Sequence, residues 1–578
     1  MPEINNIKSA GQPAPLSAPV PPECLKNELE FVLDYIPDEE TYLITSEGGG
    51  GHKSAADAIQ YKLLDQAGNK SGAVHRVDVL KNSILPNFIA DKATGVWDQA
   101  KKEGNVEKQI SLVKGKFLGI VTWRRLADIL FFLPIFLKTF FTLWGNRKIT
   151  RIVDTQAMGT TAIVAAARLA NFLFQRHIEV LKMMTDMPTE EAIHFAASAK
   201  SLSSADKKIY RILSTAPFPQ YKDETESNYI DRMDAWWKEH FNLSLKEGQV
   251  RYTDFPLRPA FIRAKEGTLS GDIGIKLNNA DEKKLLVDAG IIDEDTVSKR
   301  GGKAFDAANG TIVKTEYDYS PVDVGSEDMV GLITIGSMAN AGATKAYIED
   351  VIDLANLHND LASRDESGEG HEMKQFHLFV ACGRHEAGKP SLFSDVAAMI
   401  GKYKQEGRVP QNLHIVPMGF QSDEEMAPIM HRANFGIYGA GGLTTMETLA
   451  ASDPERAHVF IHSDAKEAKA DMSDAQIQEE LLKGYVLWER GNAEFQLKND
   501  GYKAQLVAPQ EIFRKRLTEI LELEAGMEEI YSSVTHEHAV GESKNATAEG
   551  SASFGNPLVL DARPFTQIAA STAGVVLS

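Results

Sequence analysis

Cysteine is almost absent from this chain, which contains only Cys24 and Cys382. Two cysteines exclude a disulfide-stabilised scaffold and a cysteine-rich metal site, and they suit a reducing compartment. The N-terminal residues also lack the basic and apolar regions of a secretory signal, and they include a proline-rich stretch at 13–22. We therefore expect a cytoplasmic protein.

Positive charge is in deficit: 62 Lys and Arg stand against 81 Asp and Glu, a formal net charge of −19. Such a charge disfavours general binding to nucleic acid, so we expect no nucleic-acid partner. A hydrophobic content of 43% is ordinary for a soluble globular protein. At 578 residues the chain exceeds what one core usually serves, which predicts two large domains.

Two familiar nucleotide-binding motifs are missing from the segment 41–59, although it has four consecutive glycines. A P-loop needs a glycine directly before Lys53-Ser54 and another five positions upstream, but His52 and Glu47 stand there. A dinucleotide-binding fingerprint that starts at Gly48 lacks its third glycine, because Lys53 occupies that position. Shifted registers of the second motif remain open.

The same segment has a pattern of strand, glycine loop and helix, with the helix expected from Ser54. Consecutive glycines let the backbone approach a ligand closely, and a helix N-terminus favours anions or developing negative charge. His52 follows the glycines and is placed to exchange a proton with a bound substrate. The alternative is a flexible turn with an incidental histidine.

Residues 101–151 contradict the acidic character of the whole, with eleven basic and three acidic side chains, a local charge of +8. The apolar stretch 126–144 within it carries Asp128, Pro134 and Lys138, which argues against a membrane-spanning helix. A Phe-rich helical segment flanked by basic residues is typical of an element that lies in the interface of an anionic membrane. The alternative is a buried core helix.

Alternating strands and helices predict an α/β protein. The C-terminal half repeats the strand–glycine–helix pattern at 330–342 and at 435–450. Two such segments in one unit suggest a diphosphate ligand. The expected organisation is a disordered leader at 1–27, an N-terminal domain at 28–263, a linker or insertion at 264–325, a C-terminal domain at 326–531 with an insertion near 464–486, and a disordered tail at 532–578.

Taken in order, these motifs resemble glycosyltransferase family 28, which includes monogalactosyldiacylglycerol synthase, processive diacylglycerol glucosyltransferase and the peptidoglycan lipid-intermediate GlcNAc transferase. The resemblance rests on Gly48–Ala56, Phe255–Pro259 and Gly441–Glu447. It implies the GT-B fold, in which two Rossmann-like parallel-sheet domains face each other across a cleft. It also implies a peripheral membrane enzyme.

The implied activity is inverting transfer of a hexose from a UDP-sugar to a membrane lipid such as diacylglycerol, with no metal and no cofactor. The acidic pair Asp293 and Asp295 is interpreted as part of a solvated loop. The alternatives are a nucleotide-sugar epimerase or hydrolase, a transferase with a soluble or protein acceptor, and an inactive lipid-binding adaptor.

On the acceptor side, the resemblance makes His52 and Asp186 candidates for activating the acceptor hydroxyl, with Gly49, Gly50 and Gly51 permitting close approach. On the donor side, Glu447 would accept the ribose hydroxyls and Arg258 would neighbour the base or diphosphate. A solvated first-turn role for Glu447 is the alternative. The implied donor-binding residues are Arg258, Gly336, Ser337, Phe420, Gln421, Gly441, Gly442, Leu443, Thr444, Thr445, Glu447, Glu489 and Asn492.

Overall fold

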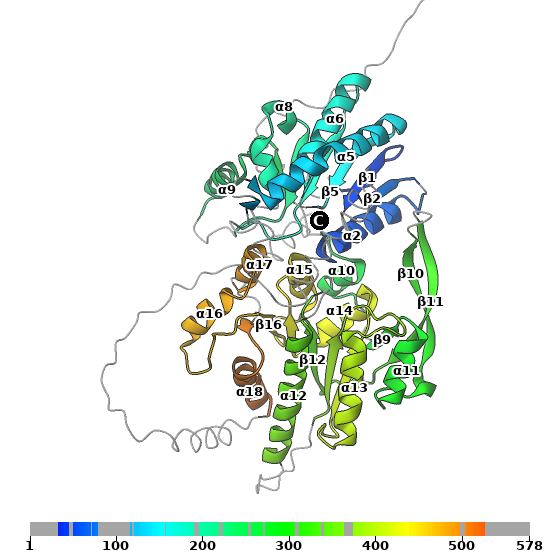
Figure 1. Ribbon diagram of the computed structural model, residues 1–578, viewed down its shortest axis with the longest axis vertical. Coiled ribbons are helices and arrows are strands. Elements are labelled where there is room, and N and C mark those ends of the chain that lie inside the picture. Colours follow the sequence, from blue (N-terminus) through cyan, green and yellow to red (C-terminus); the bar gives the residue numbers. More distant parts are fainter. Residues whose placement is uncertain are drawn as a thin grey trace, which may run out of the picture.

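Two parallel six-stranded sheets organise the part of the chain that the computed structural model describes (Figure 1). The expected leader and tail, Gly49, Ser337 and the basic segment up to residue 115 lie outside the described residues. The structure describes residues 33–45, 50–70, 72–78, 116–117, 121–156, 158–189, 196–218, 224–252, 256–269, 272–306, 311–336, 340–362, 374–497 and 503–525.

The N-terminal sheet has the order β2-β1-β5-β6-β7-β8. From β1 the chain goes to β2 on one side and later to β5 on the other, so the order reverses between β1 and β5. Such a reversal is where open α/β sheets bind their ligands. The strands are β1 (Glu40–Thr45), β2 (Val74–Asp78), β5 (Ile149–Asp154), β6 (Glu179–Met183), β7 (Tyr210–Ser214) and β8 (Val250–Tyr252). The main helices are α2 (Gly50–Gln66), α5 (Trp123–Gly145), α6 (Thr160–Phe174) and α9 (Glu226–Phe241).

Apolar residues on both faces hold this sheet between two layers of helices. In β1, Tyr42 and Ile44 pack into the cluster that includes α5 and α6, while Leu43 points to the opposite face. There it meets Ile59 and Leu63 of α2. Side chains alternate between the faces of a strand, so an apolar run of this kind is buried on both sides.

The C-terminal sheet has the order β14-β13-β12-β15-β16-β17, which reverses between β12 and β15. Both pairings of β12 are parallel. The strands are β12 (Met329–Thr334), β13 (Phe376–Ala381), β14 (Leu413–Met418), β15 (Phe435–Tyr438), β16 (His458–His462) and β17 (Lys503–Val507). The helices are α12 (Ala341–Ala362), α13 (Leu392–Gln405), α14 (Asp423–Arg432), α15 (Gly442–Ala451), α16 (Asp474–Leu482), α17 (Leu487–Leu497) and α18 (Glu511–Ala525).

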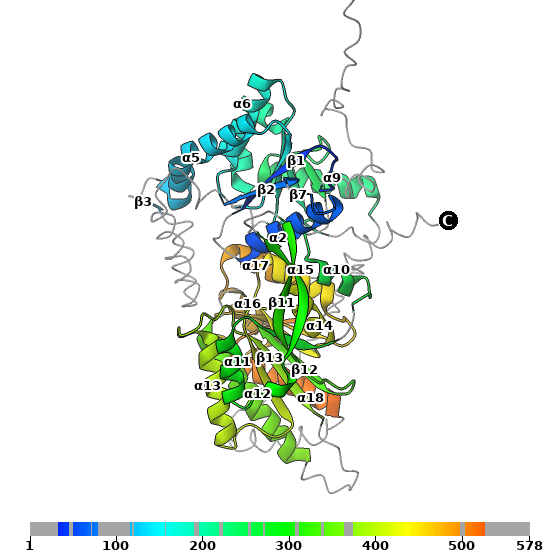
Figure 2. The same ribbon diagram turned by 90° about the vertical axis from the view of Figure 1, so that its right-hand side faces the viewer.

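The segment between the two sheets has secondary structure of its own. An antiparallel sheet of β9 (Gly274–Leu277), β10 (Ser298–Asp306) and β11 (Thr311–Pro321) is joined by α11 (Ala280–Asp288). The β10–β11 hairpin runs from the C-terminal domain along one side of the molecule toward α2 (Figures 1 and 2). The preceding helix α10 (Pro259–Lys265) buries Ala260 and Phe261 in the C-terminal core, so a domain boundary at residue 263 passes through that helix.

The predicted fold class, an α/β protein with two Rossmann-like parallel-sheet domains in a GT-B-like arrangement, is confirmed. The domains meet where α2 of the first lies against α15 of the second, with α10 and α17 beside them (Figure 1). The carboxyl ends of the strands in both sheets lead toward this junction, because helix α2, which follows β1, and the loops after β6 and β15 contribute to it.

The apolar stretch 126–144 lies within one continuous helix, α5, which includes Pro134. One face of α5 is core: Ile135, Phe140 and Leu143 are buried, and a Cβ on Gly159 at the start of α6 would lie 2.6 Å from Ile135. None of the described helices is long and apolar enough to cross a membrane. The opposite face is more than half exposed at the large apolar residues Ile129, Leu130, Leu133, Phe141 and Trp144.

Candidate functional site

His52 lies in the first turn of α2, which begins at Gly50 and not at the expected Ser54. Its ring nitrogen Nδ1 is 2.8 Å from the hydroxyl of Thr185, in the loop after β6. Its carbonyl oxygen accepts a hydrogen bond from the Thr155 hydroxyl, which follows β5, at 3.3 Å. The histidine is therefore held at the point where the strand order of the N-terminal sheet reverses.

Asp186 directly follows Thr185 and is half-buried. Its Oδ1 accepts a hydrogen bond of 2.9 Å from the side-chain amide of Asn492, on α17 of the other domain. Two residues that the sequence assigned to opposite substrates are thus in direct contact. Asp186 and His52 belong to one local structure, because Thr185 connects them.

Glu447, in the second turn of α15, forms a bidentate ion pair with Arg258 at the start of α10. The Nε and NH2 atoms of Arg258 donate to the two carboxylate oxygens at 2.7 and 2.9 Å. The Glu447 side chain is only 8% exposed, which the solvated first-turn alternative does not explain. Burial by itself would lower the pKa of Arg258. The charge and hydrogen bonds of Glu447 outweigh burial and raise this pKa above its ordinary value, so the guanidinium stays charged.

The two predicted glycine loops of the C-terminal domain are adjacent, because they follow the neighbouring strands β12 and β15. Gly336 has φ +94°, a left-handed conformation that favours glycine. A Cβ on Gly439 would lie 3.0 Å from the backbone of Ile335, so the loops approach closely. The amino end of α15, with Gly441 and Gly442, opens at the same edge of the sheet.

The first turn of α15 also contacts the N-terminal domain. A Cβ on Gly442 would lie 2.1 Å from the carbonyl oxygen of Thr185, so any other residue there would push the domains apart. Leu443 packs against Met187 in a small apolar cluster. Thr444 is half-buried, and the Thr445 hydroxyl is buried without a hydrogen-bond partner among the described residues.

The loop after β14 presents one exposed and one buried member of the predicted donor set. Phe420 is 48% exposed, and the Arg384 guanidinium lies over its ring at 5.2 Å. Gln421 is buried, and its amide pairs with the backbone of Lys276 on β9 at 2.8 and 2.9 Å. Gln421 therefore ties this loop to the antiparallel sheet, while Phe420 offers an aromatic surface.

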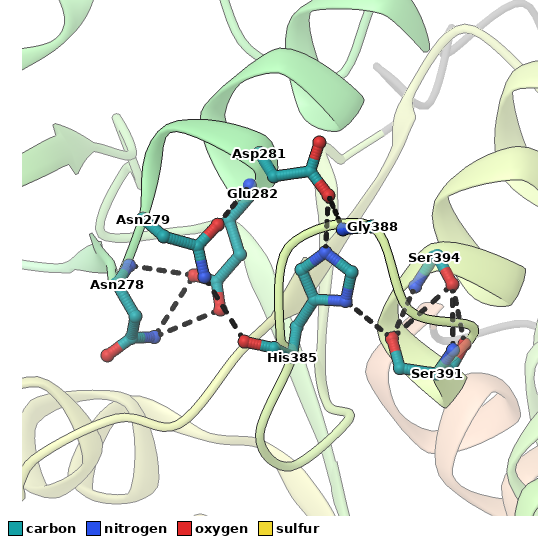
Figure 3. Close-up of polar contacts among 8 residues, drawn as sticks. All are labelled: Asn278, Asn279, Asp281, Glu282, His385, Gly388, Ser391 and Ser394. Atoms are coloured by element: carbon teal, nitrogen blue, oxygen red, sulfur yellow. Dashed lines mark hydrogen bonds and ion pairs between the residues drawn. The ribbon is translucent and has the colours of Figure 1, made fainter.

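A polar cluster around His385 joins the loop after β13 to the start of α11 and to the cap of α13 (Figure 3). His385, after β13, has Nε2 2.9 Å from Asp281 and Nδ1 2.7 Å from the Ser391 hydroxyl. The order Ser, His, Asp looks like a hydrolytic triad, but Ser391 caps α13 and accepts the N–H of Ser394. Buried Glu282 lies so close to Gly419 that a Cβ there would be 2.3 Å from its carboxylate.

Sequence reasoning missed a network at the carboxyl end of β16. His462 joins Tyr347 through Nδ1 at 2.9 Å and Asp464 through Nε2 at 3.2 Å. The amide of Asn340 donates to the same Asp464 oxygen at 2.8 Å. Burial alone would raise the pKa of Asp464. The hydrogen bonds from His462 and Asn340 outweigh burial and leave this pKa below its usual range. The sequence signal for this network was the polar residue Asp464 just after the buried strand β16.

A second missed feature lies next to His52. Lys182 on β6 and Asp154 at the end of β5 form an ion pair of 3.0 Å, and both side chains are fully buried. Asp154 also accepts hydrogen bonds from the Thr160 hydroxyl and from the backbone N–H of Gln156. A lysine within an otherwise apolar strand was the sequence signal for this pair.

Two further expectations concern α17 and metals. Glu489 is half-buried on α17, three residues before Asn492. Among the described residues, no group of three or more His, Cys, Asp or Glu side chains has the arrangement of a metal site. Asp293 precedes a single 3₁₀ turn, and the neighbouring Glu294 pairs with Lys283 at 3.0 Å.

Neither protein-family models nor curated proteins match this chain. Among solved structures, MurG of Acinetobacter baumannii is similar over 85% of this chain and 93% of its own, with 14% identity and a TM-score of 0.38. A trehalose 6-phosphate synthase of Burkholderia multivorans is similar over 87% of this chain and 100% of its own, with 9% identity and a TM-score of 0.31. The Escherichia coli trehalose-6-phosphate protein bound with UDP-2-fluoro glucose is similar over 87% of this chain and 99% of its own, with 10% identity and a TM-score of 0.29.

Proposed function

We propose that this protein is a metal-independent glycosyltransferase that moves a hexose from a UDP-sugar to a membrane lipid. The observation that carries the proposal is the meeting of His52 and the loop 185–187 with the amino end of α15. Each group lies at the carboxyl edge of its own parallel sheet, and each edge includes a reversal of strand order. A donor on one edge therefore faces an acceptor on the other.

The donor edge has the chemistry that a nucleoside diphosphate needs. The amino end of α15 and the loop at Gly336 and Ser337 would accommodate the diphosphate, where backbone N–H groups favour anions and stabilise the leaving group. The exposed ring of Phe420 would contact the base. Each Glu447 oxygen retains a second lone pair beside its bond to Arg258, so the carboxylate can still accept the ribose hydroxyls.

The sugar would lie between the diphosphate loops and the end of β16, where Asp464 and Asn340 are linked. Asp464 is half-buried and held as an acceptor by His462, which suits a hexose hydroxyl. Glu489 completes the proposed donor set on the α17 side.

The acceptor edge offers two bases, His52 and Asp186, and the transfer needs one of them to remove the proton of the acceptor hydroxyl. The hydrogen bond between Thr185 and His52 fixes the orientation of the imidazole ring. Gly50 and Gly51 start the helix beside it, and among the described residues no atom outside the immediate helix lies within 4 Å of a Cβ placed on Gly51.

A lipid acceptor is supported by the exposed apolar face of α5. Arg147 and Lys148, which follow the end of α5, are exposed beside it. Apolar side chains rimmed by basic ones suit the interface of an anionic membrane. We call this surface, made of Ile129, Leu130, Leu133, Phe141 and Trp144, the α5 face.

The function is tested by incubating the purified protein with a panel of UDP-sugars and a lipid extract and detecting glycolipid and UDP by mass spectrometry. We expect transfer with at least one UDP-sugar. Hydrolysis or epimerisation without transfer would indicate the other enzyme classes, and binding of lipid with no turnover of any UDP-sugar would indicate an adaptor.

Replacing Glu447 should weaken UDP binding. Loss of charge-assisted hydrogen bonds to the ribose costs on the order of 1.5 to 3 kcal/mol per bond. Glu447→Gln is preferred to Glu447→Ala, because it fills the same space beside half-buried Arg258. Calorimetric titration with UDP measures the loss, and a thermal melt checks that the variant is folded. An unchanged affinity in a folded variant would remove Glu447 from the donor site.

His52→Ala should lower the turnover number about 10²–10⁴-fold, the usual contribution of a general base. UDP affinity should stay at the parent value, because the His52 ring is held by Thr185 in the loop on the acceptor side. Asp186→Asn, measured in parallel, identifies which residue is the base. If turnover survives without His52 and disappears without Asp186, the role passes to Asp186.

A further inference from the structure

Asn492 has no amide N–H left for a donor sugar. The side chain is 0% exposed. Its Nδ2 donates to Asp186 Oδ1 and to the carbonyl oxygen of Ala440, both at 2.9 Å, and its Oδ1 accepts the N–H of Met187 at 2.8 Å. A primary amide has two N–H donors, so both are used within the protein.

The partners of this amide come from both domains. Ala440 directly precedes the glycines at the start of α15, whereas Asp186 and Met187 belong to the loop after β6. One buried side chain therefore joins the loop proposed to hold the donor to the loop that carries a candidate base. A buried, fully paired amide fixes its partners in a single arrangement, because any displacement leaves polar groups unsatisfied.

Two close approaches show that the loop 185–189 is shaped to receive this contact. A Cβ on Gly442 would lie 2.1 Å from the carbonyl oxygen of Thr185, and a Cβ on Gly491 would lie 2.1 Å from the hydroxyl of Thr189. Helices α15 and α17 thus present glycine at both points where the loop crosses them. At its first residue the same loop reaches His52, through the Thr185 hydroxyl.

We propose that Asn492 is a positioning residue that couples the donor loop to the acceptor side. The proposal rests on the glycosyltransferase function above. In this proposal, Asn492 contacts neither substrate. Asn492 holds the loop 185–189, so that Asp186 and the Thr185–His52 pair face the donor only while the two domains are in contact. Loss of this contact should slow the chemical step and leave nucleotide binding intact.

The kinetic test uses Asn492→Asp, which has nearly the same shape but presents carboxylate oxygens to Asp186 and to the Ala440 carbonyl. We expect the turnover number to fall about 10²-fold, the scale of a 1 Å misplacement, with UDP affinity unchanged. A second carboxylate beside Asp186 favours its protonated form, so the acidic limb of the kcat/KM profile should move to higher pH. Weaker binding of the intact UDP-sugar with an unchanged turnover number and pH profile would make Asn492 a donor ligand and overturn the proposal.

The structural test does not need activity. Asn492→Ala removes the acceptor of the Met187 N–H, so amide hydrogen exchange at residues 184–189 should accelerate, while β5 exchanges as before. Gln496→Ala is the matched control: Gln496 lies one turn further along α17, is also 0% exposed, and its amide has no hydrogen-bond partner among the described residues. Equal exchange at 184–189 in the parent and in Asn492→Ala would refute the coupling. Failure of the parent to turn over any UDP-sugar would instead refute the proposed function.

Discussion

At the residue scale, the buried ion pair of Asp154 and Lys182 is the costliest feature near the site. Taking two charges out of water carries a penalty that only good geometry and further hydrogen bonds offset. Here the Thr160 hydroxyl and the Gln156 N–H supply those bonds to Asp154. The pair fixes the carboxyl ends of β5 and β6, which lead to Thr155 and Thr185, two of the residues that contact His52.

Removing one partner of this pair should destabilise the N-terminal domain strongly. Lys182→Met leaves the Asp154 carboxylate buried without its cation, a change that costs about 3 to 5 kcal/mol. Urea unfolding followed by circular dichroism measures the loss. The double variant Lys182→Met with Asp154→Asn should recover part of it, because no charge then remains buried. A single variant as stable as the parent would mean that solvent reaches this site.

Which features of the candidate site could be predicted depends on how far apart in the sequence the contacting residues lie. The segments 48–56 and 441–447 could be located from sequence alone, because glycines and a helix start form a local pattern. The pairing of Arg258 with Glu447 joins residues 189 positions apart, and that of Asp186 with Asn492 joins residues 306 positions apart. Such contacts depend on how distant segments pack in three dimensions, and no local pattern encodes them.

At the scale of elements, buried strands were the most predictable part of the fold. The strand Phe435–Tyr438 starts where the predicted strand–glycine–helix segment 435–450 starts, and it ends directly before Gly439. Helix α2 starts earlier than expected at Gly50, since first-turn residues need no intrahelical partner for their N–H groups and glycine is tolerated there. The segment 264–325 lacks long apolar runs, yet half-exposed antiparallel strands form within it.

The β10–β11 hairpin forms a second connection between the domains. The side-chain amide of Asn69, in the turn after α2, pairs with both backbone groups of Ile312 at 2.8 and 2.9 Å. Asn69 has φ +60°, a conformation that asparagine tolerates better than most residues. The hairpin therefore connects the C-terminal domain to the C-terminal end of α2. The first turn of the same helix carries His52.

Asn69→Gly should release this hairpin without straining the turn, because glycine accepts the same φ and lacks the amide. We expect faster amide hydrogen exchange at Ile312 and its neighbours in β11, and unchanged exchange in β12. Asn242→Gly is a matched control, since Asn242 has φ +55° at the end of α9, in the N-terminal domain. The same protection of Ile312 in the parent and in Asn69→Gly would show that the contact does not hold the hairpin.

At the scale of the whole molecule, apolar surface and charge are unevenly distributed. The net charge is −19, yet exposed Arg147 and Lys148 border the α5 face. Lys138, which belongs to the same basic segment, is turned inward toward the carbonyl oxygen of Asp78 at 3.5 Å, and burial lowers its pKa. Of the described residues, Lys138 is thus poorly placed to attract an anionic surface, whereas Arg147 and Lys148 are well placed to do so.

The α5 face should bind anionic vesicles. Replacing Leu130, Leu133 and Phe141 by Gln keeps the helix but removes side chains whose full burial is worth about 1.5 to 3 kcal/mol each. Co-sedimentation with vesicles of phosphatidylcholine plus an anionic phospholipid should then show the parent in the pellet and the triple variant in the supernatant, with UDP affinity equal. Leu357→Gln on α12, also exposed but in the other domain, should sediment like the parent.

A charge variant separates the two contributions to this binding. Arg147→Gln with Lys148→Gln should weaken binding by about 1 kcal/mol per charge. The loss should shrink as salt is added, because ions screen the attraction of exposed charges to the surface. The triple apolar variant should instead be impaired at every salt concentration. If the parent stays in the supernatant at moderate salt, or if the triple variant pellets with it, the α5 face does not enter a membrane, and a soluble acceptor becomes the better hypothesis for this transferase.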